Sequence, residues 1–469
     1  MSSRKISLAL ALLLGMTGMA SDSVKVMSAA QLLKAIKKYH PVAKTAAAET
    51  DIAKAEITTA RGNFDPVLQY KNGEKQFDGI NYYREQLTEI RVPTWYGIEV
   101  NAGLTSLNGS RINPEETSGR TSLVGISVPL AKNLVMDKRR AALAQAKIMS
   151  RMALNEQRTV LNNLYYEALD AWWNWILSRR LLTITGEALS ANEKRFEWIK
   201  KAWRNGDRAA IDTVEAYAQW QSFQYLYNEA QLAVQNALLE VSLFLWKENN
   251  EPYTLPAGVQ PAEEDSLNIM APAPVLETLI STALLRHPEL QEYNYKLDYL
   301  AVEKKLKFQE LLPSLNLQYN QLGKGYGVLK TATQWPLVEN NFRYGVSLSV
   351  PLRFSQGRGE YRKAKLKIAQ TEYGREQKKN EIANKIKTAY NEWVTAARQG
   401  NVQQDLYNSY SRLLKGEETR FFNGESSLFL VNARELKLLE AQQKLQEVWV
   451  KQQKKRVTLQ WAAGLLADN

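Results

Sequence analysis

Apolar and polar residues alternate with a period of two in four segments of the chain. These segments are residues 96–104, 124–130, 315–319 and 344–352. A strand with one apolar face has this period, because successive side chains point to opposite sides. The pattern therefore predicts four β-strands, arranged as one hairpin within about 64–130 and another within about 313–352.

Proline is absent from two much longer stretches, 132–251 and 352–469. Proline inside a helix costs roughly 3 kcal/mol, so tracts of this kind favour long uninterrupted helices. We expect long helices over 132–204 and 359–422, each followed by a glycine-containing turn at 205–208 or 423–426. Returning helices are expected over 209–246 and 427–464. Helices of this length must pack side by side, as in coiled coils.

Several short motifs occur twice in the same order. The pair His40-Pro41 recurs as His287-Pro288, and the tetrapeptide Ser-Val-Pro-Leu occurs at 127–130 and 349–352. Five ordered matches indicate an internal duplication, with a first repeat at 21–250, a linker at 251–273 and a second repeat at 274–469. The first copy has an excess of 25 residues, which we place around 78–93; its position in the topology stays open.

The N-terminus resembles a secretory signal. Arg4 and Lys5 precede an apolar run and the small residues that end at Ala20, so we expect residues 1–20 to be a signal peptide. No later segment offers the ~18 uncharged apolar residues of a membrane helix. Three destinations remain: the periplasm, the extracellular space, or an outer membrane entered as a β-barrel.

The composition excludes several kinds of catalytic and metal-binding site. The chain has 469 residues, a formal charge of +12, two histidines and no cysteine. Disulfide scaffolds and cysteine-based metal or catalytic sites are therefore excluded. Neither histidine has a second ligand at helical spacing, and no phosphate-binding loop or nucleophile motif occurs. We expect no enzyme activity, no metal and no cofactor. Export also argues against nucleic acid as the partner of the basic clusters.

Four strands are too few to close a membrane barrel, which needs about eight. An open edge in lipid would leave backbone groups unsatisfied at several kcal/mol each. The chain should therefore form oligomers, and three copies would supply twelve strands.

The ordered set of elements resembles the TolC-like outer-membrane efflux proteins over essentially the whole mature chain. The resemblance rests on the paired Ser-Val-Pro-Leu strand ends and on the two turns, Asn205-Gly206-Asp207 and Asn423-Gly424-Glu425, each followed by a patterned helix. It implies a mixed α+β membrane protein: a homotrimer with a twelve-stranded barrel in the outer membrane and a periplasmic coiled-coil tunnel. Family members are exit ducts of drug efflux pumps or type I secretion, and they dock through a periplasmic adaptor to an inner-membrane transporter.

The resemblance also implies roles for the turns. Asn205, Gly206, Asp207, Asn423, Gly424 and Glu425 would form the periplasmic tips and contact the adaptor. Family tunnels are often narrowed by acidic residues just past the tip. The first copy has Asp212 and Glu215 there, whereas we assign Phe429 and Asn432 to the corresponding places of the second copy. These four residues are the candidate constriction, which is either acidic or, through Phe429, apolar. Dipole-stabilising first-turn acids and a packed phenylalanine are the alternative.

A second class of function stays open at this point. A non-conducting periplasmic scaffold or adaptor could also contain long coiled-coil helices, although it would not need strands with a continuous apolar face. The pattern does not identify a cargo or a particular pump.

Overall fold

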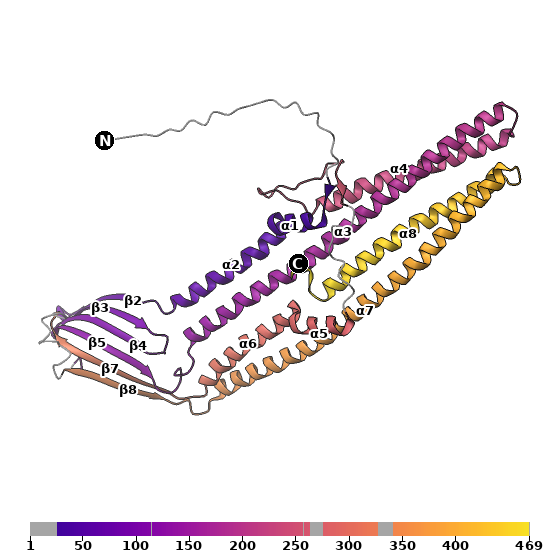
Figure 1. Cartoon of the computed structure of the whole chain (residues 1–469). Helices are drawn as coiled ribbons and strands as arrows, with labels where there is room; N and C mark the ends of the chain where they lie inside the picture. The colour runs from indigo at the N-terminus through magenta and orange to yellow at the C-terminus, as the bar shows by residue number, and fades with distance from the viewer. Residues whose placement is uncertain (1–25, 114, 257, 263–274, 327–340, 469) are drawn as a thin grey trace, which may run out of the picture.

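A computed structural model describes residues 26–113, 115–256, 258–262, 275–326 and 341–468 of the chain. The expected signal peptide (1–20) and much of the linker lie outside the described residues. The molecule is elongated, with a β-sheet at one end and two helix turns at the other (Figure 1).

The helices of the first half are α1 (Ala29–Tyr39), α2 (Pro41–Gly62), α3 (Lys138–Arg204) and α4 (Ala210–Ser242). Those of the second half are α5 (Leu276–Arg286), α6 (Pro288–Gln309), α7 (Ser355–Phe422) and α8 (Leu428–Ala462). A short 3-10 helix, η3 (Leu466–Asp468), follows, and β1 (Val26–Met27) pairs in parallel with β6 (Gln260–Pro261). Helix α3 begins at Lys138 rather than 132, and α7 begins at Ser355 rather than 359.

Each long helix packs along two shorter ones placed end to end. Helix α3 contacts α2 near the sheet and α4 toward the tip, and α7 contacts α6 and α8 in the same way. The 67 residues of α3, at about 1.5 Å each, give a helix about 100 Å long.

The two His-Pro pairs divide the shorter helices. His40 and His287 each occupy the N-cap, where their Nδ1 atoms accept a hydrogen bond from the N–H of Val42 and Glu289, both at 3.2 Å. The proline that follows takes the first helical position, where no N–H is needed. The non-metal interpretation of the histidines thus has a physical basis in helix capping.

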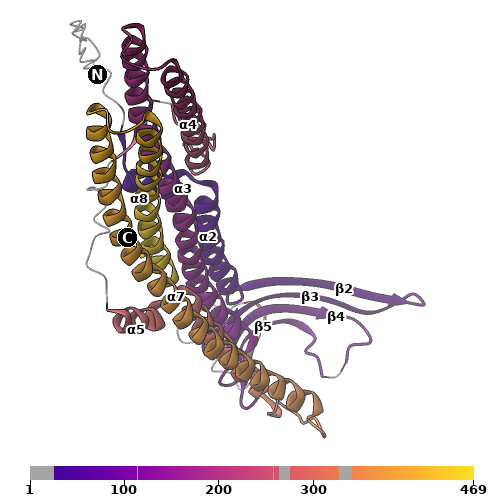
Figure 2. The same cartoon turned by 90° about the vertical axis from the view of Figure 1, so that its right-hand side faces the viewer.

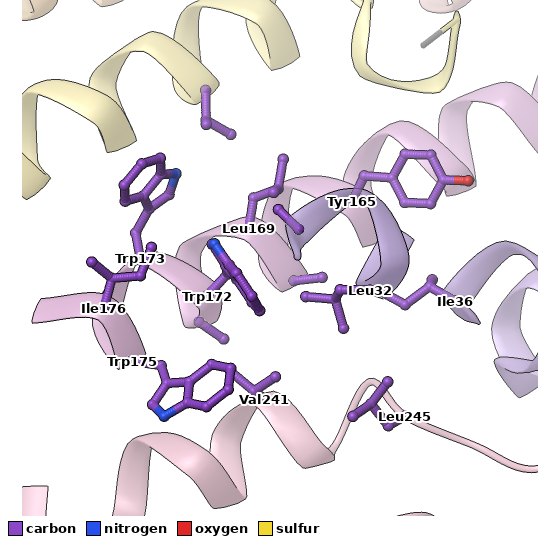
Figure 3. Close-up of a cluster of buried hydrophobic side chains, with 14 of the residues drawn as sticks. Leu32, Ile36, Tyr165, Leu169, Trp172, Trp173, Trp175, Ile176, Val241 and Leu245 are labelled. Atoms are coloured by element: carbon purple, nitrogen blue, oxygen red, sulfur yellow. The ribbon is translucent and has the colours of Figure 1, made fainter. Parts of the chain in front are cut away.

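The largest core lies where α1, α3, α4 and α8 meet (Figure 3). Leu32 and Ile36 of α1, Trp172 and Trp175 of α3 and Val241 of α4 all belong to this buried cluster, and Val241 lies beside Trp175 (Figure 3). Trp172, Trp173 and Trp175 are all at least 97% buried, so this run of tryptophans serves packing between helices.

The sheet corrects one prediction. Over the residues that the structure describes, it contains six strands in the order β2-β3-β4-β5-β7-β8, so the prediction of four strands is wrong. The strands are β2 (Val67–Phe77), β3 (Ile80–Pro93), β4 (Glu99–Asn108), β5 (Gly119–Pro129), β7 (Ser314–Lys324) and β8 (Phe342–Ser349). All neighbours are antiparallel. The excess residues of the first half form the β2–β3 hairpin, turning at Asp78 and Gly79, both with positive φ.

Candidate functional site

The sheet has two faces of opposite character. Residues directly opposite each other in an antiparallel pair share a face, so the pairing register assigns every side chain to one side. One side carries a continuous group of apolar residues, which we call the apolar belt. It comprises Leu68, Tyr70, Ile90, Val92, Val100, Ala102, Leu104, Val124, Ile126, Val128, Leu315, Leu317, Tyr319, Tyr344, Val346 and Leu348.

Much of the belt is exposed. Leu68 is 72% exposed on β2, and Val346 and Leu348 are 62% and 64% exposed on β8. An apolar surface that continues across six strands exceeds the scattered apolar residues of an ordinary protein surface, and it indicates contact with lipid or another protein.

The opposite face, here the polar face, has a hydrogen-bonded network across four strands. Arg91 and Glu89 form an ion pair at 2.8 Å, and Glu89 accepts a hydrogen bond from Asn101 at 3.1 Å. The Asn101 amide also donates to Oδ1 of Asn320 at 3.3 Å. Gly125 of β5 lies between these two asparagines, where a Cβ would collide with both side chains. The polar face thus satisfies its buried groups internally.

The two turns at the far end have the same backbone geometry. Asn205 and Asn423 are the C-caps of α3 and α7, and Gly206 and Gly424 follow with φ of +84° and +80°. At the first turn, Gly206 N–H bonds to the carbonyl of Trp203 and Asp207 N–H to that of Ala202.

The second turn repeats these bonds, from Gly424 to Phe421 and from Glu425 to Arg420. This pair of bonds is the Schellman motif, which needs a left-handed residue and therefore favours glycine. The side chains of Asp207 and Glu425 are not required for it.

Between the two turns lies a cavity of about 540 Å³. Its lining includes four of the six predicted tip residues, Asn205, Asp207, Asn423 and Gly424, together with Trp198 and Arg208. The Arg208 guanidinium lies 4.1 Å from the centre of the Phe421 ring and donates to the Phe421 carbonyl at 3.4 Å. Arg208 therefore connects the first turn to the end of α7, a contact that sequence reasoning missed because the two residues are far apart in the chain.

The structure brings together two of the four candidate constriction residues. The Asn432 amide donates to Oε1 of Glu215 at 3.2 Å, which joins α4 to α8. Asn432 is buried, Asp212 is half-buried, and Phe429 is 67% exposed. Asn432 and Glu215 therefore serve packing between helices within one chain, whereas Phe429 is available to a further surface.

The assignment of Phe429 and Asn432 as counterparts of Asp212 and Glu215 is wrong by one position. Helices α4 and α8 begin at Ala210 and Leu428, and this offset matches Phe429 with Ile211. Ile211 is 69% exposed, so both copies place an exposed apolar side chain at the second helical position. In this alignment, Asp212 and Glu215 of the first copy correspond to Leu430 and Ala433 of the second copy.

Arg195 is a further residue that the pattern did not reveal. Its guanidinium lies 2.6 Å from Glu435 of α8 and 3.6 Å from Glu418 of α7. It thus joins α3 to both α7 and α8 near the tip. The arginine and its main partner are separated by 240 residues, and nothing in the local sequence marks the pair.

Within the part of the chain that the structure describes, no group of three or more histidine and acidic residues is placed to hold a metal ion. None of the helices in that part has the length and apolar character needed to cross a membrane.

Residues 279–465 match the protein family described as outer membrane efflux protein. A membrane protein from Pseudomonas aeruginosa has a similar fold, with a TM-score of 0.65 at 14% identity over 93% of this chain and 92% of that one. The CmeC outer membrane channel of Campylobacter jejuni gives 0.59 at 16% identity over 93% and 85%. The MtrE outer membrane channel of Neisseria gonorrhoeae, in its open state, gives 0.62 at 14% identity over 93% and 88%. No curated protein matches the chain by sequence.

Proposed function

Because the resemblance to the TolC-like outer-membrane efflux proteins is confirmed, we propose that this chain is an outer-membrane channel with a large periplasmic portion. It acts as the exit duct of a tripartite efflux pump or a type I secretion system. Its working form is a homotrimer that meets a periplasmic adaptor protein and an inner-membrane transporter, and outer-membrane lipid surrounds its sheet. Transport through a lumen is passive, so no catalytic residue, metal or cofactor is needed.

The apolar belt is the observation that carries this proposal. An exposed apolar surface of this extent is costly in water, at roughly 25 cal/mol per Å². In an outer-membrane barrel it faces lipid, and the polar face with its Glu89–Asn101–Asn320 network lines the lumen. A periplasmic scaffold or adaptor, the alternative class, has no use for this division into two faces.

The helices support the periplasmic part of the proposal. All run away from the same end of the sheet (Figures 1 and 2), and α3 alone extends about 100 Å at about 1.5 Å per residue. Equal lengths of 11 residues for α1 and α5 and of 22 for α2 and α6 also support an origin by duplication.

At the tips, we assign adaptor contact to the turns and the constriction to exposed apolar side chains. Phe422, Phe429, Ile211 and Val214 are between 63% and 69% exposed although they lie next to a packed core. The internal bond between Glu215 and Asn432 leaves these two groups less available to a pore. The constriction is therefore apolar, formed by Phe429 together with Ile211.

Single-channel recording in planar bilayers tests the proposal. The purified chain should form discrete conducting channels, and Phe429→Ala should raise their conductance because it removes bulk from the narrowest point. Tyr373→Ala is the matched control, since Tyr373 is 77% exposed on α7 but remote from the tip. Absence of any channel would contradict the proposed function. An unchanged conductance in Phe429→Ala would contradict only the assignment of Phe429 to the constriction.

In-cell crosslinking addresses the partners. A photoreactive residue at position 205 or 423 should capture a periplasmic adaptor, while one at position 373 should not. Capture at position 373 alone would contradict the assignment of the turns.

A further inference from the structure

The β2–β3 hairpin is an integral part of the sheet. Strand β3 pairs with β4 continuously from Arg84 to Pro93, and β2 pairs with β3 along its whole length. The hairpin is therefore not a loop folded over the sheet, and it adds two strands to one side of it (Figure 2).

The division into two faces continues through the hairpin without a break. One row of directly paired residues runs Leu68–Ile90–Ala102–Val124 from β2 to β5, all in the apolar belt. A second row, four residues farther from the helices along β2, runs Asn72–Gln86–Ser106–Arg120 and is entirely polar.

The belt thus ends at the same level on the hairpin as on β4 and β5. The polar face also crosses from hairpin to sheet, through the bond between Glu89 of β3 and Asn101 of β4. The β2–β3 hairpin and the rest of the sheet therefore face the same two environments at the same levels along the strands.

Two strands of the described sheet have a free edge, β2 at one side and β8 at the other. Strand β2 follows α2 and leads away from the helices, whereas β8 leads back to α7. If β8 of one copy lies beside β2 of the next, the two strands are antiparallel, as every other pair in the sheet is. In lipid neither edge can stay unpaired, because its N–H and C=O groups have no water to bond.

We propose that β8 of one copy pairs with β2 of a second copy of this chain, and that three copies close an eighteen-stranded barrel rather than the twelve-stranded barrel implied by the family resemblance. The proposal rests on the proposed function. At about 4.8 Å between strands and a tilt of about 40°, the wall is about 36 Å across, compared with about 24 Å for twelve strands. The hairpin thereby widens the outer-membrane exit and determines the size of cargo that this part of the duct admits.

Disulfide crosslinking tests the closure directly, because the chain has no cysteine of its own. Val346 lies in the belt of β8 and faces the same side as Leu68 and Tyr70 of β2. Val346→Cys combined with Leu68→Cys or with Tyr70→Cys should give crosslinked products in outer membranes, up to three chains on non-reducing gels. Val346→Cys with Gln76→Cys is the matched control, since Gln76 lies about 20–26 Å farther along the strand and should not crosslink.

Three results would overturn the eighteen-stranded barrel. Crosslinking of Val346→Cys with Ala102→Cys of β4 would mean that the wall closes without the hairpin, as in a twelve-stranded barrel. Products that stop at two chains would mean that two copies close twelve strands. Failure of both β2 pairs, while a maleimide still labels Val346→Cys, would mean that the edges do not meet. The unsubstituted chain separates this inference from the proposed function: if it is not an outer-membrane protein, both fail.

Discussion

Ile126→Arg probes the apolar belt at its centre. Ile126 is 43% exposed on β5, one of the inner strands of the sheet, so its side chain does not depend on how the sheet edges close. If the belt faces lipid, the substitution places a charge in the hydrocarbon. If the belt faces water, the substitution replaces an exposed apolar side chain with a charged, well-hydrated one.

The two environments predict different magnitudes. Arginine on the lipid face of a barrel costs about 2–4 kcal/mol at the bilayer midplane. Since about 1.4 kcal/mol corresponds to a factor of ten, the folding equilibrium of each chain should fall roughly 30- to 700-fold. In water, a surface substitution of this kind changes stability by less than about 0.5 kcal/mol.

Ser127→Arg is the matched control, because Ser127 is the next residue on β5 and belongs to the polar face. It lies directly opposite Glu99, whose carboxylate can pair with the new guanidinium. We expect its cost to stay below about 1 kcal/mol. The two variants thus place the same charge on adjacent residues, one facing lipid and the other facing the lumen.

The measurement is the free energy of unfolding in lipid vesicles, from urea titration with the heat-modifiable oligomer as the readout. The lipid assignment is refuted if the two variants lose equal stability, or if Ser127→Arg loses more than Ile126→Arg.

Three further predictions concern the turns, the core and the histidines. Gly424→Ala should weaken the second turn by about 1–2 kcal/mol, because alanine at φ +80° is strained although its Cβ meets no neighbour. Amide hydrogen exchange at the tip should then become roughly 5- to 30-fold faster. The control Gly416→Ala, within α7, should leave the exchange rate unchanged. Trp175→Ala should cost about 3–5 kcal/mol, seen as a lower urea midpoint, because Trp175 is fully buried against Trp172; an unchanged midpoint would contradict the core assignment. The pKa of His287 lies below its ordinary 6.5, mainly because burial disfavours the charged ring; this outweighs the opposing effects of Glu289 and of the hydrogen bond to the Ala462 backbone, and Lys385 and Lys378 lower the pKa further. The stability of this cap is therefore present above about pH 6.5 and is lost as the pH falls from there through the folded-state pKa. His287→Asn keeps a capping side chain without a titratable ring and should flatten the dependence of the melting temperature between pH 7 and 5, while an unaltered profile would contradict the assignment.

Helix caps and turns were the most predictable part of the fold. Each His-Pro pair coincides with the start of a helix, α2 at Pro41 and α6 at Pro288, because an imidazole nitrogen caps the helix and proline fits its first position. Both effects are local, so one sequence suffices to find them. The glycines of the turns act in the same way, through a left-handed φ that needs no distant partner.

The β2–β3 hairpin was missed because its pattern is not a simple alternation. On its belt side, β2 has Leu68 and Tyr70 but then Asn72 and Glu74, since only the half nearest the helices lies in the belt. The other half pairs polar residues, including the ion pair of Glu74 with Arg84 at 2.9 Å. A strand that crosses from an apolar to a polar environment loses the period-two signal over half its length.

Contacts near the tips could not be predicted from the sequence. The bonds of Glu215 with Asn432 and of Arg195 with Glu435 join helices more than 200 residues apart. They depend on the axial alignment of α3, α4 and α8, which no local pattern in the sequence specifies. An error of one residue in matching the two repeats, as in the pairing of Phe429 with Asp212, already changes which side chains are compared.

Separation of inner and outer membranes from cells that produce the chain tests the central claim most directly. We predict that the chain is recovered in the outer-membrane fraction as a heat-modifiable trimer that requires detergent for its release. Recovery in the soluble periplasmic fraction, without detergent, would contradict the proposal that this sheet lies in lipid and that the helices form the periplasmic part of a channel.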